Sequence, residues 1–240
     1  LEFNHARPLD VMGRVLAPFR RGKVAIKGDA DFIIESGRLN TARPDVFESD
    51  PVNLIRCFVL AGQLDLLFHP DAIKQITRSL RLIGPEVRNS PQANAWFLEI
   101  LTSPKSVERI LRAMNESGVL GRFVPDFRKI VALMQFNMYH HYTVDEHLIR
   151  AVGVMAEIAN GGLKQELPLT HELLPHLNDI RLLYVALFLH DIAKGRPEDH
   201  SIAGARIARR FCPRLGLSPA ETETVAWLVE YHLVMSEIAQ

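Results

Sequence analysis

An uninterrupted apolar run, residues 182–189, ends directly in His190 and Asp191 and limits the folds open to this chain. At eight residues the run is far short of the 18 or so needed to cross a bilayer. Because the run is apolar on every side, we expect it to form the central helix of a helical bundle. A histidine and a carboxylate then stand at the end of a buried helix, where each needs a partner.

The residues around this run are also patterned as helices. Apolar residues recur at helical spacing, which predicts helices over residues 143–160, 179–193, 201–214 and 218–234. Ser218 and Glu221 form a capping-box pattern at the start of the last helix. We interpret residues 161–175 as the connecting loop. These features predict an all-helical unit over residues 138–240.

The first half of the chain opens differently. Two short β-rich runs, residues 23–26 and 32–35, flank a turn-forming cluster and predict a small β-hairpin. Asp29 and Asp31 within the cluster have the spacing of paired metal-binding aspartates, but we interpret them as turn residues. After Pro44 the pattern is helical. Helices are expected over residues 51–68, with Asp50 as the cap, and over 71–82, 91–101, 104–116 and 126–135. The fold class is therefore mainly α, with the hairpin and a helical linking segment over residues 1–137.

Composition narrows the classes of partner. The 240 residues include 28 Lys plus Arg and 28 Asp plus Glu, so the formal net charge is zero. Nucleic acids and anionic membranes are usually bound through a net basic surface, and we expect neither as a partner. No basic stretch followed by an apolar run opens the sequence, so we expect no signal peptide. Cys57 and Cys212, far apart in apolar surroundings, suit buried free thiols in a reducing cytoplasm.

Three more histidines fall on apolar helix faces. His147 lies in the stripe of the helix over 143–160, His200 shares a line with Ile207 and Phe211, and His232 follows the stripe of the last helix. One such histidine is commonly a hydrogen-bonded core residue. Several imidazoles and a carboxylate buried without partners would each cost roughly 1–3 kcal/mol or more. A divalent cation satisfies all of them at once.

The ligand types indicate which cation. Imidazole nitrogen and carboxylate oxygen suit Mn, Mg, Fe or Zn, and the lack of a nearby thiol argues against a structural zinc cluster. Mn or Mg is our first expectation, with Fe or Zn as alternatives. Asp191, next to His190, can also bridge two ions, and two-metal sites activate a water and stabilise an attacked phosphoryl group.

The strings at residues 142–147 (YTVDEH), 187–195 (LFLHDIAKG), 199–201 (DHS) and 230–236 (EYHLVMS) together resemble the HD-domain metal-dependent phosphohydrolases. More narrowly, they are similar to the HD domain of the bifunctional protein-PII uridylyltransferase/uridylyl-removing enzymes of bacterial nitrogen control. Residues 40–135 are similar to the segment that joins the nucleotidyltransferase and HD domains in that family, so the resemblance covers most of the chain.

The resemblance implies that His147, His190 and Asp191 are metal ligands and that His200 and His232 hold a second metal position. It implies hydrolysis of the phosphodiester between UMP and a tyrosine hydroxyl of the PII signal protein, with Asp191 and Lys194 as catalytic residues. Lys194 would contact the phosphodiester. The sequence is equally consistent with Lys194 as a solvated cation at a helix C-terminus. His140 and His141 are expected at the surface.

Two departures from the family pattern qualify this expectation. HD families complete the metal site with a further Asp on a later helix, which we expect to follow Gln240. No Gly-Ser pair of the transferase centre occurs, so we expect the uridylyltransferase active site to lie outside this chain.

Two alternatives stay open. One is another HD hydrolase acting on free or cyclic nucleotides, and the other is a non-catalytic regulatory helical domain. Arg206, Arg210 and Arg214 form a stripe that suits a solvated helix face or an acidic partner.

Overall fold

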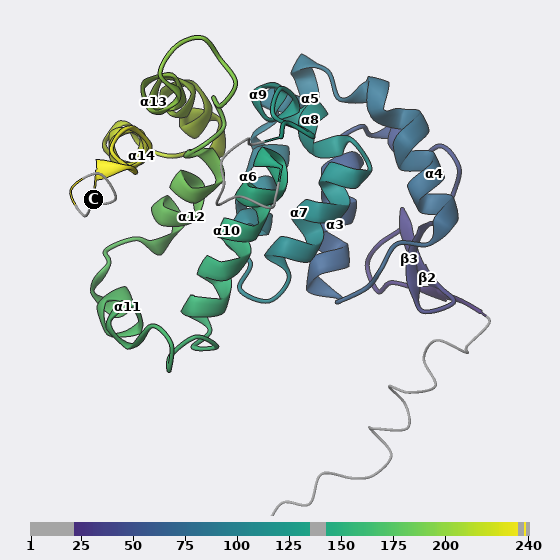
Figure 1. The fold of residues 1–240 in the computed structure, drawn as a ribbon. Helices are drawn as coiled ribbons and strands as arrows, with labels where there is room; N and C mark the ends of the chain where they lie inside the picture. The colour runs from purple at the N-terminus through teal and green to yellow at the C-terminus, as the bar shows by residue number, and fades with distance from the viewer. Residues whose placement is uncertain (1–21, 135–142, 235–237, 239–240) are drawn as a thin grey trace, which may run out of the picture.

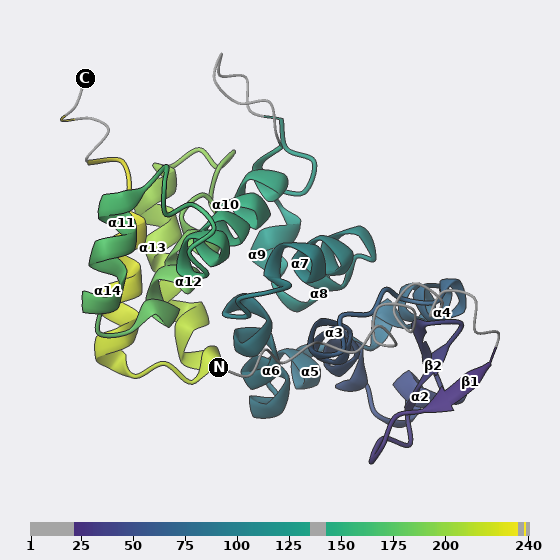
Figure 2. The same ribbon diagram turned by 90° about the horizontal axis from the view of Figure 1, so that it is seen from below.

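The computed structural model describes residues 22–134, 143–234 and 238. A small sheet lies at one end of the molecule, and helices α10 to α14 lie at the other (Figures 1 and 2). The fold is mainly α, as predicted. No helix of the described residues is long and apolar enough to span a membrane.

The elements follow one another in a simple order. The first half contains β1 (Lys23–Ala25), β2 (Phe32–Glu35), β3 (Arg38–Thr41), α2 (Val46–Ser49), α3 (Asn53–Gln63), α4 (Pro70–Ser79), the 3-10 turn η2 (Leu80–Leu82), α5 (Pro85–Asn89), α6 (Pro91–Leu101), α7 (Val107–Glu116), α8 (Val119–Phe123) and α9 (Pro125–Arg128). The second half contains α10 (Val144–Ala159), α11 (Pro168–Leu173), η3 (Leu174–His176), α12 (Ile180–Leu189), α13 (His200–Phe211), η4 (Cys212–Leu215) and α14 (Pro219–Glu230).

The predicted hairpin forms and gains a third strand. β1 pairs with β2 and β2 with β3, both antiparallel. Ser36 and Gly37 between β2 and β3 have φ of 51° and 73°, the conformation of a tight hairpin turn whose twist matches the strands. β3 was missed because Leu39 is its only apolar residue, although Leu39 is fully buried.

Asp29 and Asp31 are turn residues, as interpreted from the sequence. Asp29 Oδ1 accepts hydrogen bonds from the backbone N–H groups of Asp31 and Phe32 at 2.9 and 3.1 Å. Both carboxylates pair with Arg56 of α3, and Asp31 also pairs with Arg43 at 2.7 Å. The cluster therefore fastens the sheet to α3.

Most predicted helices are present, with their ends shifted by a few residues. The helix over 91–101 is confirmed as α6, and the capping box forms, with Glu221 N–H donating to Ser218 Oγ and Ser218 N–H donating to the Glu221 carboxylate. The prediction of a helix over 126–135 was wrong, because α9 ends at Arg128 and Ala132 adopts a left-handed φ of 56° that turns the chain back. The loop over 161–175 contains α11, which begins with Pro168 in its first turn.

One continuous apolar core runs through both halves. The Phe97 ring of α6 lies 5.3 Å from the Phe123 ring, 5.6 Å from the Phe188 ring and 6.2 Å from the Phe211 ring. Phe188 belongs to the apolar run of the sequence, and its helix α12 lies among α10, α13 and α14 (Figure 1). The central position expected for this helix is therefore confirmed.

The predicted arginine stripe divides into two kinds of residue. Arg206 and Arg210 are exposed, and they pair with Glu198 and Asp126. Arg214 is half-buried and donates to the carbonyls of Arg88 and Phe123 at 3.1 and 3.3 Å. The prediction of a solvated helix face is therefore wrong for Arg214, because its guanidinium lies against the Phe123 and Phe211 rings and joins the two halves.

Candidate metal centre

Four histidines and one aspartate converge from four helices of the second half. His147 lies in the first turns of α10, His190 directly follows α12, His200 is the first residue of α13, and His232 lies two residues beyond α14. Asp191 is buried between them, with 3% of its side chain exposed. The structure thus brings together every ligand-type residue that the sequence singled out.

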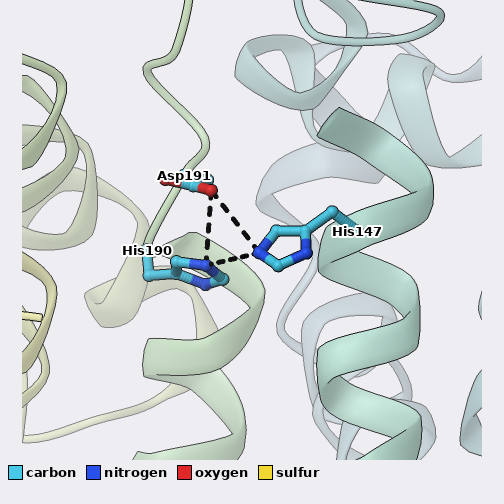
Figure 3. A group of neighbouring side chains, drawn as sticks. All are labelled: His147, His190 and Asp191. Atoms are coloured by element: carbon cyan, nitrogen blue, oxygen red, sulfur yellow. Dashed lines mark hydrogen bonds and ion pairs between the residues drawn. The ribbon is translucent and has the colours of Figure 1, made fainter. Parts of the chain in front are cut away.

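The two oxygens of Asp191 divide the histidines into pairs. Asp191 Oδ2 lies 3.6 Å from His147 Nε2 and 3.4 Å from His190 Nε2 (Figure 3). Asp191 Oδ1 lies 3.5 Å from His200 Nε2 and 3.6 Å from His232 Nε2. Both groups have the spacing of ligands around a metal ion and share one carboxylate, which can bridge two ions.

Backbone carbonyls orient two of the imidazoles. His190 Nδ1 lies 2.8 Å from the Leu187 carbonyl, and His232 Nδ1 lies 2.8 Å from the Val229 carbonyl. A carbonyl only accepts, so each Nδ1 carries a proton, and in the neutral ring each Nε2 presents a lone pair toward Asp191. Metal-binding histidines commonly have their second nitrogen fixed in this way.

Two atoms of the cluster have no hydrogen-bond partner among the described residues. Asp191 Oδ1 and His200 Nε2 are both buried, and neither makes a hydrogen bond of normal geometry. A buried acceptor without a partner costs about 1–3 kcal/mol, and native structures keep few of them. The donor set and these two atoms fit a divalent cation, for which unpaired nitrogen and oxygen lone pairs are the ligands.

The electrostatics of the cluster keep the Asp191 carboxyl ionised, which is the state that a metal ligand needs. Burial works to raise the pKa of the Asp191 carboxyl, but the neighbouring His190, His232 and Lys194 outweigh it and hold that pKa well below its ordinary value. Burial lowers the pKa of His200, which favours the neutral form of its ring. The pKa of His232 is raised despite burial, because Asp191 stabilises its charged form.

Lys194 lies within the cluster. Its Nζ contacts Asp191 Oδ2 at 2.7 Å, and only 23% of its side chain is exposed, so it is not a solvated cation. His140 and His141 lie outside the described residues.

Close helix packing sets the spacing of the cluster. A Cβ on Gly204 of α13 would lie 2.8 Å from Val229 Cγ1 of α14. Asp199 caps α13 by accepting from the N–H groups of Ser201 and Ile202, which fixes the helix start at His200. The sequence reasoning missed these two positioning residues, although an Asp at the start of a predicted helix is a readable capping signal.

Comparisons with known proteins agree with this arrangement. Residues 32–123 match the family described as uridylyltransferase GlnD third domain, and residues 144–239 match the HD domain family. The bifunctional uridylyltransferase/uridylyl-removing enzyme of Nitrobacter hamburgensis is 55% identical over 245 aligned residues, which cover 100% of this chain and 26% of the relative. The chain therefore spans about a quarter of that relative's length.

Two solved structures share the fold at low sequence identity. Both are described as a tRNA-processing enzyme, in apo forms, with TM-scores of 0.54 and 0.53 and identities of 15% and 13%. They cover 83% and 85% of this chain, and 47% and 51% of their own chains are matched. The match along the whole chain and the two domain matches show that the chain belongs to the bifunctional uridylyltransferase/uridylyl-removing enzymes, of which it carries the third domain and the HD domain.

Proposed function

We propose that this chain is the phosphodiesterase part of a uridylyl-removing enzyme, which hydrolyses UMP from a tyrosine of the uridylylated PII signal protein. The observation that carries the proposal is the convergence of four imidazoles on one buried carboxylate whose Oδ1 has no hydrogen-bond partner among the described residues. Because the chain spans only 26% of its relative, the reaction and the substrate are taken from that relative's name and from the family resemblance.

The ligand roles follow from the two groups. His147, His190 and Asp191 would hold one divalent cation, Mn or Mg being our first expectation, and Asp191, His200 and His232 would hold a second. Such a cation supplies a bound water of lowered pKa and neutralises charge on the attacked phosphoryl group.

The other contributions to the proposed reaction come from side chains of this protein. His190 and His232 keep their lone pairs aimed inward through their carbonyl partners. Lys194 lies 2.7 Å from Asp191 Oδ2, so its charge is available to a phosphodiester bound beside that oxygen. His147 is the most exposed of the four histidines, with 30% of its side chain accessible, which marks the open side of the cluster for a bulky protein substrate.

The test is release of UMP from uridylylated PII by the complete protein with Mn²⁺. We expect release to be lost in His190→Ala and Asp191→Ala. His176→Ala is the matched control, because His176 is an exposed histidine of η3 outside the cluster, and this variant should keep full activity.

The same assay separates the two alternatives. Faster turnover of a free or cyclic nucleotide than of uridylylated PII would identify another HD hydrolase. Absence of stoichiometric metal and of any turnover would identify a non-catalytic regulatory domain.

A further inference from the structure

The first turn of α10 is fastened to the helices of the first half. The Asp145 carboxylate, 4% exposed, accepts a hydrogen bond from Asn115 Nδ2 of α7 at 2.8 Å. Its other oxygen accepts from the Ala132 backbone N–H at 3.2 Å. Asp145 stands two residues before His147, so these bonds fix the backbone that carries a ligand of the proposed metal centre.

A second pair strengthens the same junction. Arg112 of α7 pairs with Glu146 of α10 and also with Glu108 at 2.9 Å. Further along α10, a Cβ on Gly153 would overlap the Glu108 carboxylate and lie 2.9 Å from Glu108 Cβ. α7 and α10 therefore pack without spare room, and a shift of α7 must move α10.

The turn that supplies the Ala132 N–H also reaches the other side of the metal centre. The next residue, Leu133, accepts from the Val144 N–H at 3.0 Å. The Leu133 side chain fills the space at Gly195, where a Cβ would lie 2.8 Å from Leu133 Cδ2. Gly195 follows Lys194 directly, so one turn contacts both segments that border the cluster.

The pairing of Asp145 is unusual for a buried carboxylate. The described residues place no cation within ion-pair distance of it; its partners are a neutral amide and a backbone N–H. Buried polar groups can contribute less to stability than apolar replacements of similar volume, and in some proteins they specify one geometry. A carboxylate here is better explained by a need for fixed geometry than by a need for stability.

We infer that Asn115 and Asp145 are positioning residues for His147, so that the helices of the third domain set the geometry of the metal centre in the HD domain. This inference rests on the proposed metal centre. It gives residues 107–134 a role beyond linking two domains, because a change in α7 reaches a metal ligand through two hydrogen bonds.

The test is Mn²⁺ titration of the complete protein by calorimetry, which includes the further Asp ligand expected after Gln240, with thermal unfolding of each variant. Asn115→Asp places two carboxylates in contact, and we expect the Kd for Mn²⁺ to rise about tenfold, the lower end of what disturbed ligand support costs. Asn115→Asp combined with Asp145→Asn reverses the hydrogen bond, because the new amide donates to the new carboxylate while its oxygen still accepts from Ala132. This exchange should return the Kd to within about threefold of the parent.

Asn53→Ala is the matched control. Asn53 is a buried asparagine of α3 that donates to Asp31 Oδ2 and the Val46 carbonyl, so its loss should lower the unfolding midpoint without changing the Kd. If Asn115→Asp does not fold, Asn115→Ala is the milder variant, and its Kd should also rise.

Three results overturn the inference. They are an unchanged Kd in the folded Asn115 variant, a Kd that stays high in the exchange variant after its midpoint recovers, and a Kd that rises equally in Asn53→Ala. A parent chain that binds no Mn²⁺ is a different failure, because it removes the proposed metal centre and this inference with it.

Discussion

Gly204 offers a sharp test of how the helices set the spacing of the cluster. An added Cβ would lie 2.8 Å from Val229 Cγ1 and 3.7 Å from the carbonyl oxygens of Leu189 and His190. Carbon atoms pack at about 3.5–4.0 Å. Gly204→Ala therefore forces α13 and α14 apart by roughly half an ångström or more, and His200 begins α13 while His232 follows the end of α14.

The expected cost follows from two opposing effects. Overpacking a well-filled core costs about 1–3 kcal/mol. Alanine in place of glycine inside a helix returns about 0.8–1 kcal/mol. The net loss in the free energy of unfolding is about 1 kcal/mol, which lowers the unfolding midpoint of a chain of this size by about 2–4 °C.

The assay is thermal unfolding followed by circular dichroism. Val229→Ala in the same chain removes the atom that the new Cβ meets, so the double variant should lose less than the sum of the two single variants. A midpoint that rises in Gly204→Ala would show that helix propensity outweighs the close contact and would refute the packing argument.

Three further perturbations test other parts of the structure. Arg214→Ala should lower the free energy of unfolding, measured in urea, by about 2–3 kcal/mol, because it removes a half-buried cation that joins the two halves. Arg206→Ala, which removes one member of an exposed ion pair, should cost about 0.5 kcal/mol or less. Equal losses in the two variants would contradict this difference. Ser218→Ala should cost about 1 kcal/mol through the lost helix cap, and an unchanged urea midpoint would count against the cap. Burial raises the pKa of the Cys57 thiol and raises that of Cys212 from 9.0 to about 12, so both should resist a thiol reagent in the folded state. Rapid labelling of the native protein at pH 8 would contradict this resistance. Since these pKa values are raised, the stability that the two protonated thiols contribute is intact below pH 9 and is lost as pH rises toward 12.

The helices and the cluster were predictable from the sequence for one reason. Histidines at apolar positions of amphipathic helices must point into the same core, so His147, His200 and His232 could be grouped with His190 and Asp191 before any coordinates were known. The burial of the apolar run around Phe188 was equally predictable, because a segment that is apolar on every side is stable only in the core, between other helices.

The missed features depend on tertiary contacts instead of periodicity. β3 has one apolar residue in four and forms because Ser36 and Gly37 permit a tight turn and Leu39 finds a buried site. The helix expected over 126–135 fails because the chain must turn at Ala132 to begin α10, and that turn is stabilised by Asp145, thirteen residues away. Arg214 shows the same limit, since its aromatic partners lie far from it in the sequence.

The central claim is that Asp191 and the four histidines form a metal centre. The most direct measurement is the metal content of the complete protein after loading with Mn²⁺ and removal of free ion, for the parent and for Asp191→Asn, which keeps the shape but removes the shared charge. We predict at least one Mn²⁺ bound per parent chain and a loss of that stoichiometry in Asp191→Asn. A parent chain without stoichiometric Mn²⁺, or equal retention by both proteins, would contradict the account.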